Sequence, residues 1–339
     1  MDPVLAARLA AHGLHEREGR VLLGAGDVPR GSARDAYAAR CERVPGDLVV
    51  VWGPRGAPRA VRPQDARLVT RALLPPDEEA ARRALQTAVR AIDRPALQAL
   101  HEVADAMRDA VAAGPLPRDD LHQALREALP AALLWPCRGC GTRHVHPSLW
   151  RAAGLRGEVQ RVAVPGSQAA GYAALALPPG DDVRAGAELA RRVLLLHGPA
   201  TTAEVVAFLS TSTAHARALL EAAGAQPVRR DGRAAWAAPD PPEPREHRGV
   251  RLLPPGDPLL EGRDRGRVLP DPALRAKLVA VLSRTGAVLA DGRVAGTWRA
   301  RTKGGRVEVE VDAPGVARDA LEAEASTLAA ARGTVARLV

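Results

Sequence analysis

The most compact group of side chains that could do chemistry lies in the run WPCRGCGTRH, which contains Cys137, Cys140 and His144. Two cysteines separated by two residues, with a glycine in the turn between them, can direct both thiolates at one metal ion, and a nearby histidine can supply a third ligand. A redox-active pair would be expected within a βαβ unit, which the pattern lacks. The three residues are therefore candidate ligands of a structural zinc ion, with a redox pair or a plain loop carrying two thiols as the alternatives.

A second stretch, LGAGDVPR at residues 23–30, is similar to a phosphate-binding loop because Gly24 and Gly26 are separated by one residue. A dinucleotide-binding loop also needs a preceding strand, a third glycine three residues later and an acidic residue about twenty residues further on. Here Gly26 is followed by Asp-Val-Pro, which excludes that function. From the residues alone, Asp27 is expected to cap the following turn or helix.

The charge of the chain indicates a polyanionic partner. The 339 residues include 48 lysines and arginines against 39 acidic residues, which gives a net charge of +9. Only Lys277 and Lys303 are lysines, and arginine binds phosphates and guanine edges as a planar fork. One Phe, two Tyr and five Trp residues are too few for rows of rings that stack on single-stranded bases.

Cysteine content and hydropathy exclude further classes. Three cysteines are too few for a disulfide scaffold. The run MDPVLAARLAAHG has no basic segment followed by an apolar one, so we expect no signal peptide. The apolar runs GDLVVVWG and RRVLLLHG are too short to cross a membrane. The expected location is therefore the cytoplasm.

Helical periodicity dominates the first part of the chain. Apolar residues recur at three-to-four-residue spacing in five predicted helices, at 32–44, 64–73, 77–92, 95–112 and 118–128. Between the first two, the apolar runs DLVVVWG and APRAVRP flank the turn signal Pro-Arg-Gly and predict a small hairpin.

Residues 198–237 predict a helix, a turn, a second helix and a two-stranded wing. Thr201 and Glu204 have the spacing of a capping box at the start of the first helix, and Gly224 ends the second. The Asp-Gly pair at 231–232 is a type I′ hairpin signal. This order is typical of a winged helix, which binds DNA in some proteins and acts as a spacer in others.

The pattern changes after a Pro-rich, charged run at 239–249, which predicts a linker. Alternating strands joined at Asp-Gly 291–292 and Lys-Gly-Gly 303–305 predict a β-meander, and a final helix is expected at about 315–332.

These segments resemble the winged-helix DNA glycosylases of the AlkZ and YcaQ type. RLLPPGDPLLEGRDRGRVLP and VLADGRVAGTWRAR resemble the closing domain of that family, GPATTAEVVAFLSTSTAHARALLEAAG its internal winged helix, and DLVVVWGPRGAPRAVRPQDARLV its N-terminal Arg-Gly region. The resemblance implies tandem winged helices closed by a small β-barrel-like domain. It also implies excision of alkylated or crosslinked bases from double-stranded DNA, with no required cofactor.

The predicted fold class is therefore α+β, mainly α, in a monomer that does not contact membranes. The predicted parts are an N-terminal winged-helix-like domain at 1–93, a second helical or winged-helix-like unit with the Cys-x-x-Cys loop at 94–158, a winged-helix domain at 159–238, the linker at 239–249, and a β-barrel-like domain with a terminal helix at 250–339.

The resemblance also implies an active-site loop. The family's water-positioning Gln pair would fall on Gly24 and Gly26, which have no side chains, so Asp27 becomes the candidate catalytic residue. Arg55 and Arg59 would belong to the same site, with Arg59 at a position where the family usually has histidine.

Candidate DNA-binding residues come from the second helix of the 198–237 segment, its wing and the C-terminal hairpins. They are Arg217, Arg229, Arg230, Arg233, Arg293, Arg299, Arg301, Lys303 and Arg306. The favoured interpretation is a protein that binds damaged duplex DNA and has an altered or impaired glycosylase activity. The alternatives are a non-enzymatic transcriptional or lesion-sensing protein on the same scaffold and an interaction scaffold without nucleic acid.

Overall fold

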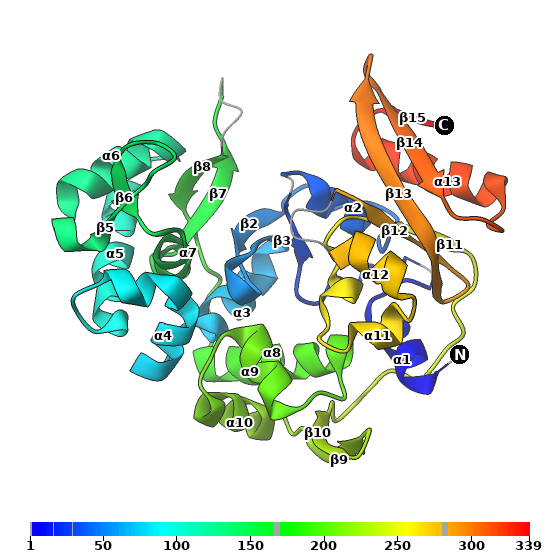
Figure 1. Ribbon diagram of the computed structural model, residues 1–339, viewed down its shortest axis with the longest axis horizontal. Coiled ribbons are helices and arrows are strands. Elements are labelled where there is room, and N and C mark those ends of the chain that lie inside the picture. Colours follow the sequence, from blue (N-terminus) through cyan, green and yellow to red (C-terminus); the bar gives the residue numbers. More distant parts are fainter. Residues whose placement is uncertain (1, 16, 29, 166–169, 280–283) are drawn as a thin grey trace. The chain divides into compact units, whose positions relative to one another are not determined.

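The structure is a computed structural model that describes residues 2–15, 17–28, 30–165, 170–279 and 284–339 (Figure 1). The contacts within the chain divide it into two compact units, each assembled from separate stretches of sequence. Unit 1 contains residues 1–46, 191–200 and 224–339, and unit 2 contains residues 47–190 and 201–223. The five-part division predicted from the sequence stays a prediction, as does the arrangement in tandem winged helices.

Unit 2 is mainly helical. Its helices are α3 (Ala66–Thr70), α4 (Glu78–Leu85), α5 (Ala96–Ala110), α6 (Arg118–Ala128), α7 (Pro147–Arg156), α9 (Thr202–Leu209) and α10 (Thr213–Ala222). Its strands are β2 (Val49–Trp52), β3 (Pro58–Val61), β4 (Leu116–Pro117), β7 (Val159–Ala163) and β8 (Ala170–Ala174), which follow one another in one sheet in the order β3-β2-β7-β8-β4. A separate two-stranded sheet pairs β5 (Leu134–Pro136) with β6 (Arg143–Val145).

The predicted hairpin and helices of this part are present, although the α-helices are shorter than their periodicity indicates. The predicted helix at 77–92 is α4 followed by a 3₁₀ segment at Gln86–Ala91, and the one at 64–73 has 3₁₀ turns at both ends of α3. A 3₁₀ turn repeats every three residues, so it keeps nearly the same apolar spacing as an α-helix. Periodicity alone therefore overestimates the α-helical length. In unit 1, α2 likewise ends at Ala38 rather than at residue 44.

The core of unit 2 forms around α5 and α7. Leu100, Val103 and Met107 of α5 are fully buried, as their three-to-four-residue spacing predicts. The indole of Trp52 packs on the backbone of α7 at Gly154, where an added Cβ would lie 2.1 Å from the ring. Glycine costs about 1 kcal/mol inside a helix, and here it makes room for the largest aromatic side chain of the sheet.

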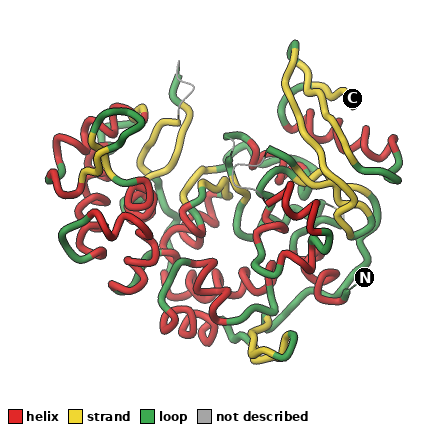
Figure 2. Tube along the Cα trace, viewed as in Figure 1, coloured by secondary structure: helices red, strands yellow, loops and turns green. Residues whose placement is uncertain are grey.

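Unit 1 combines the two ends of the chain. Its helices are α1 (Pro3–Ala11), α2 (Ser32–Ala38), α11 (Arg265–Val268), α12 (Pro272–Val279) and α13 (Arg318–Ala331), and α8 (Asp182–His197) runs from unit 2 into it. Its strands are β1 (Ala25–Gly26), β9 (Gln226–Arg230), β10 (Arg233–Ala237), β11 (Val250–Leu253), β12 (Gly286–Ala290), β13 (Arg293–Lys303), β14 (Arg306–Asp312) and β15 (Val335–Leu338). Figure 2 distinguishes these helices and strands by colour.

The C-terminal sheet is open and has the strand order β11-β12-β13-β14-β15. The first four strands are antiparallel, and β15 lies parallel to β14 after the return through α13. Leu321 and Leu328 of α13 pack against Trp298, Val307 and Val309 on one face of the sheet. The predicted barrel-like domain is thus a curled sheet covered by a helix, with β11 and β15 as its edges. The predicted meander and terminal helix are confirmed.

The local features predicted for residues 198–237 are present. Thr201 and Glu204 form the capping box of α9, and Gly224 adopts a left-handed conformation just after α10. Strands β9 and β10 pair across Asp231 and Gly232, which both have positive φ as a type I′ turn requires. By their contacts, however, the two helices belong to unit 2 and the hairpin to unit 1.

The predicted linker at 239–249 has no regular secondary structure, but it is anchored within unit 1. Asp240 accepts two hydrogen bonds from Arg191 in α8. Further along, a ring nitrogen of the buried His247 lies 3.1 Å from the carbonyl oxygen of Leu14. The segment is therefore held at both ends rather than free to move as a flexible tether.

The buried ring of His247 makes the stability of the protein depend on pH. Burial, aided by the charges of Arg251 and His15, lowers the pKa of His247 to about 4, against 6.5 for a free ring. As the pH falls below 6.5 the unfolded chain binds the proton first, so the free energy of unfolding decreases between pH 6.5 and about 4. In urea unfolding measured across this range, His247→Gln should show a smaller decrease than the unsubstituted protein. An equal decrease in both would contradict this assignment.

A buried ion pair joins the N-terminal segment of unit 1 to its C-terminal part. Arg40 donates to both carboxylate oxygens of Asp257, at 2.8 and 2.6 Å, and these residues are only 1 % and 0 % exposed. Arg40 also donates to the carbonyl oxygen of Ala36, and Asp257 accepts from the backbone N–H of Leu259. Both charges therefore have the additional hydrogen bonds that burial of an ion pair requires.

We expect Asp257→Ala to lower the free energy of unfolding by about 3–5 kcal/mol, because it leaves a buried guanidinium without its counter-charge. The matched control is Glu322→Ala, which removes the partner of Arg318 in an exposed pair on α13 of the same unit. That change should cost less than about 1 kcal/mol. If urea unfolding shows the same decrease in the free energy of unfolding for both variants, the buried pair stabilises the protein no more than the exposed pair does.

Candidate functional site

The loop before α2 is fixed by hydrogen bonds around Asp27. Asp27 is 6 % exposed, and its Oδ1 accepts a hydrogen bond from the backbone N–H of Gly31 at 2.6 Å. The hydroxyl of Ser32 donates to the carbonyl oxygen of Gly26 at 3.3 Å. Asp27 thus closes the turn that leads into α2. Its second oxygen, Oδ2, accepts no hydrogen bond from any residue that the structure describes.

A pocket of about 670 Å³ adjoins this loop within unit 1. Its lining is basic and includes one buried carboxylate and one indole ring. The lining residues are Arg30, Gly31, Ser32, Arg34, Asp35, Pro255, Arg284, Trp298, Ala300, Ala331, Arg332 and Gly333. Asp27 is not among these residues, but its carboxylate accepts the hydrogen bond from Gly31, which is. The pocket is therefore suited to an anionic or electron-rich ligand.

The carboxylate in the pocket wall belongs to Asp35, which sequence analysis did not identify. Arg332 holds it through two hydrogen bonds of 2.9 and 2.6 Å. Burial raises the pKa of Asp35 above its usual range, the pair with Arg332 opposes this shift, and the charge of Asp27 adds to it. The same pair raises the pKa of Arg332. Asp27 is thus close enough for its charge to act on the carboxyl group of Asp35.

No local pattern could have indicated the pocket. Asp35 and Arg332 are 297 residues apart in sequence, and each alone is an ordinary charged residue on a predicted helix or at its end. Trp298 precedes Arg299 on β13. Its ring is buried and its Nε1–H donates to the carbonyl oxygen of Leu253, so it contributes to the core and to the pocket wall.

The other two residues of the predicted active-site loop belong to unit 2. Arg55 adopts a positive φ of 61° in the turn between β2 and β3, and its guanidinium carbon lies 5.4 Å from the ring centre of Phe208. Arg59 is 1 % exposed and its side chain packs on Gly53. Gly24, Gly26 and Asp27 belong to unit 1.

Two of the predicted DNA-binding residues of β13, Arg299 and Arg301, lie on one face of the hairpin. Arg299 and Arg301 alternate with the buried Trp298 and pair in register with Glu310 and Glu308 of β14. Opposite charges across an antiparallel pair attract each other and reduce the local net charge. At the tip, by contrast, two cations face each other, because Lys303 pairs with Arg306. The strongest positive field of this hairpin is therefore at its tip, which Figure 1 shows in orange.

The wing contains exposed arginines and arginines whose side chains form bonds within the protein. Arg233 is exposed, and Arg229 is exposed but donates to the carbonyl oxygen of Gly232. Arg230 donates to the carbonyl oxygen of Pro199 and lies 3.8 Å from Asp264. The remaining candidates, Arg217 on α10 and Arg293 at the start of β13, are exposed.

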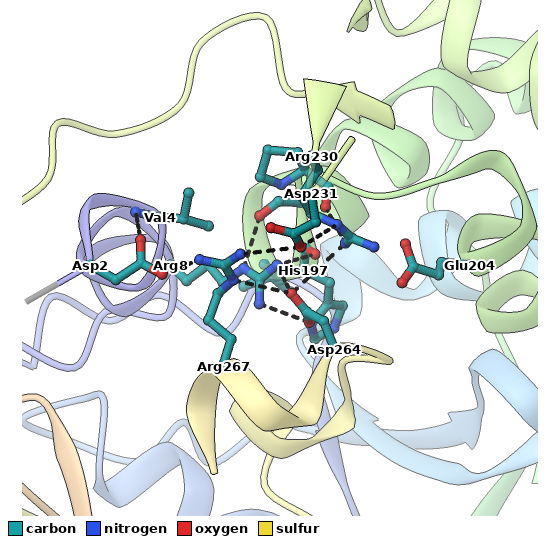
Figure 3. Close-up of polar contacts among 12 residues, drawn as sticks. Asp2, Val4, Arg8, His197, Glu204, Arg230, Asp231, Asp264 and Arg267 are labelled. Carbon is teal, nitrogen blue, oxygen red and sulfur yellow. Dashed lines mark hydrogen bonds and ion pairs between the residues drawn. The ribbon is translucent and has the colours of Figure 1, made fainter. Parts of the chain in front are cut away.

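The environment of Arg230 is an ion-pair cluster that holds the wing in unit 1 (Figure 3). At its centre Arg8 of α1 donates to both oxygens of Asp264 and to the carbonyl oxygens of His197 and Gly198. Burial alone would raise the pKa of Asp264, but the hydrogen bonds and charge of Arg8 hold it below its usual range. Arg230 therefore has a structural role that sequence analysis did not anticipate.

The predicted metal ligands Cys137, Cys140 and His144 lie together in unit 2. Their potential ligand atoms are all within 4.8 Å of one another. Cys137 and Cys140 are free thiols, and hydrogen bonds from the backbone N–H and side chain of Cys140, together with the N–H of Gly139, lower the pKa of Cys137.

The comparisons with known proteins agree with this architecture. The family model described as DNA glycosylase AlkZ-like matches residues 28–331, so the chain belongs to the AlkZ-like DNA glycosylase family. The solved structure of Streptomyces sahachiroi DNA glycosylase AlkZ has the same fold, with a TM-score of 0.66, 20 % sequence identity, and coverage of 99 % of this chain and 98 % of that one. No curated protein matches the chain.

The family match begins after Gly24 and Gly26, so it does not include the positions where the Gln pair was expected.

Within the described residues, no helix combines the length and the apolar composition needed to span a bilayer.

The two glycines differ in their capacity to carry a side chain. Gly24 has a φ of +69°, whereas a Cβ at Gly26 would meet only the carbonyl oxygen of Gly256 at an ordinary contact distance of 3.5 Å. We expect Gly24→Gln to lower the free energy of unfolding by about 1–2 kcal/mol because of its left-handed backbone. Gly26→Gln should change it by less than about 0.5 kcal/mol. Urea unfolding of both variants tests this difference, and equal losses would contradict it.

Proposed function

We propose that this protein binds double-stranded DNA that carries alkylated or crosslinked bases and hydrolyses the N-glycosidic bond of the modified base. Membership of the AlkZ-like DNA glycosylase family is the observation that carries the proposal. The net charge of +9 and the basic pocket beside the Asp27 loop are consistent with a polyanionic substrate.

Hydrolysis of an N-glycosidic bond determines what the site must supply. The bond between C1′ of the deoxyribose and the base nitrogen breaks, and its electron pair leaves with the base. A water molecule bonds to C1′ through its oxygen and transfers one proton to a carboxylate or to the solvent. A purine alkylated at N7 carries a positive charge that the departing electron pair neutralises, so the protein's main tasks are to hold the nucleotide, stabilise the cationic sugar and orient the water.

Asp27 is the residue that we propose for the last two tasks. One carboxylate oxygen is fixed by Gly31, which sets the orientation of the group, and Oδ2 accepts no hydrogen bond from the described residues. A carboxylate held in this way can stabilise an oxocarbenium-like sugar and accept a hydrogen bond from the attacking water. Asp35 is less suited to this role because Arg332 occupies both of its oxygens.

The tip of the β13–β14 hairpin is the proposed main contact with the DNA backbone. Lys303 and Arg306 face each other there, and both are exposed. The other predicted cations that remain exposed, among them Arg217, Arg233 and Arg293, would add phosphate contacts.

A second candidate function is DNA binding without catalysis, in a transcriptional or lesion-sensing protein. The observation that favours it is the pair of glycines at 24 and 26, which supply no side chain for positioning water. Both candidates predict DNA binding, so only a measurement of base release separates them.

Base release is measured under single-turnover conditions, with excess protein and duplex DNA that contains N7-methylguanine, by cleavage at the resulting abasic site. We expect release by the unsubstituted protein and a rate at least about 100-fold lower for Asp27→Asn, the lower end of what a positioned acid or base contributes. Asparagine can still accept the hydrogen bond from Gly31, so this change removes the charge and keeps the cap.

Asp271→Asn is the matched control, because Asp271 also accepts backbone hydrogen bonds at a helix start in unit 1. Its rate should equal that of the unsubstituted protein. An unchanged rate for Asp27→Asn would refute the role of Asp27. Salt-dependent duplex binding without any base release would refute the glycosylase and favour the second candidate.

A further inference from the structure

The hairpin between α6 and α7 has the construction of a metal site that is independent of the proposed DNA chemistry. Strands β5 and β6 pair antiparallel with Trp135 opposite His144, and the loop 137–142 joins them. The N–H of Cys137 donates to the carbonyl oxygen of Thr142 at 2.9 Å, and the N–H of Gly141 donates back to the carbonyl oxygen of Cys137 at 3.0 Å. These two bonds fold the loop so that its cysteines approach each other.

The backbone of this loop is arranged around the sulfur of Cys137. A Cβ added at Gly139, between the two cysteines, would lie 3.9 Å from this sulfur, and Gly141 has a φ of +69° directly after Cys140. The hydroxyl of Thr142 lies 3.2 Å from the sulfur of Cys140. A tight turn with glycines beside the cysteines brings both sulfurs within reach of one metal ion, which they would bind as thiolates.

The ring of His144 is also oriented for ligation. Its Nδ1 lies 2.9 Å from the carbonyl oxygen of Val145. A carbonyl can only accept, so Nδ1 carries the proton and Nε2 retains the lone pair that a metal ion needs. The ring packs 5.1 Å from that of His122, which lies 4.3 Å from the ring of Trp150 in the core. The ligand is therefore supported by the packed interior of unit 2.

The dimensions of the group fit zinc. With Zn–S bonds of about 2.3 Å and Zn–N bonds of about 2.0–2.1 Å in a tetrahedron, the ligand atoms lie about 3.4–3.8 Å apart. The potential ligand atoms of the three residues are all within 4.8 Å of one another, so a contraction of about 1.4 Å or less closes the site. Soft thiolates combined with imidazole favour zinc over magnesium or calcium.

We infer that Cys137, Cys140 and His144 bind one Zn²⁺ ion, with water as the fourth ligand, and that this ion fixes the β5–β6 hairpin between α6 and α7. The water position follows from the number of ligands in the described residues and from the exposure of Cys140 to solvent. We assign the ion a structural role, because it would add to the backbone bonds that hold the loop between two strands of only three residues each.

Cobalt titration of the reduced, chelator-treated full-length protein tests the inference. We expect one equivalent of Co²⁺ to produce a thiolate-to-cobalt charge-transfer band and the visible bands of a tetrahedral ion, and one equivalent of Zn²⁺ to remove them. Cys140→Ser and His144→Asn should each weaken zinc binding at least about tenfold, since even the partners of metal ligands contribute 10–100-fold. Cys140 is exposed, so its substitution is compatible with folding.

Cys41→Ala is the matched control, because Cys41 is a buried thiol in unit 1. It should retain the cobalt bands, the zinc stoichiometry and a thermal midpoint that rises with added zinc. Cys140→Ser should lose all three. Folded, reduced protein that produces no cobalt band overturns the inference, and so does a band that is unchanged in Cys140→Ser.

Discussion

The buried pair of Arg40 and Asp257 connects segments that are 217 residues apart in sequence. Asp257 belongs to the turn at 254–257, which its own backbone bond to Pro254 closes. The carbonyl oxygen of Gly256 in this turn lies against Gly26. The position of the loop that presents Asp27 therefore depends on an ion pair that has no part in the proposed chemistry. An ion pair of this kind is directional, and it specifies how two segments meet more sharply than apolar contact alone.

Several other long-range pairs have the same form. Arg8 pairs with Asp264, and Arg332 pairs with Asp35, so α1 and α2 are each joined to the C-terminal quarter of the chain by an arginine–aspartate bond. Arginine suits this use because its planar guanidinium donates to both carboxylate oxygens in a fixed geometry. Unit 1 is thus a single body formed by the two ends of the sequence, which explains why consecutive stretches do not correspond to its boundaries.

Some features depend on neighbouring residues and others on residues far apart in sequence, and only the first kind could be predicted. The capping box of α9, the type I′ turn at 231–232 and the alternation of β13 depend on neighbouring residues, and the sequence alone identified all of them. The pocket beside Asp27 depends on Asp35 and Arg332, which approach each other only in the folded chain. Family resemblance nominated Asp27, which stays a prediction, and it could not indicate that Arg230 is held by Pro199 and Asp264.

The long-range pairs change the interpretation of the positive charge. Arg8, Arg40 and Arg332 are neutralised by aspartates inside unit 1, so they add nothing to the field that a DNA backbone would experience. Between β13 and β14, glutamates lie opposite Arg299 and Arg301, whereas at the tip Lys303 faces Arg306. The net charge of +9 therefore acts where cations lack an acidic neighbour, and it does not make the surface uniformly basic. A protein with this distribution would be positioned on DNA by local contacts at the hairpin tip more than by its total charge.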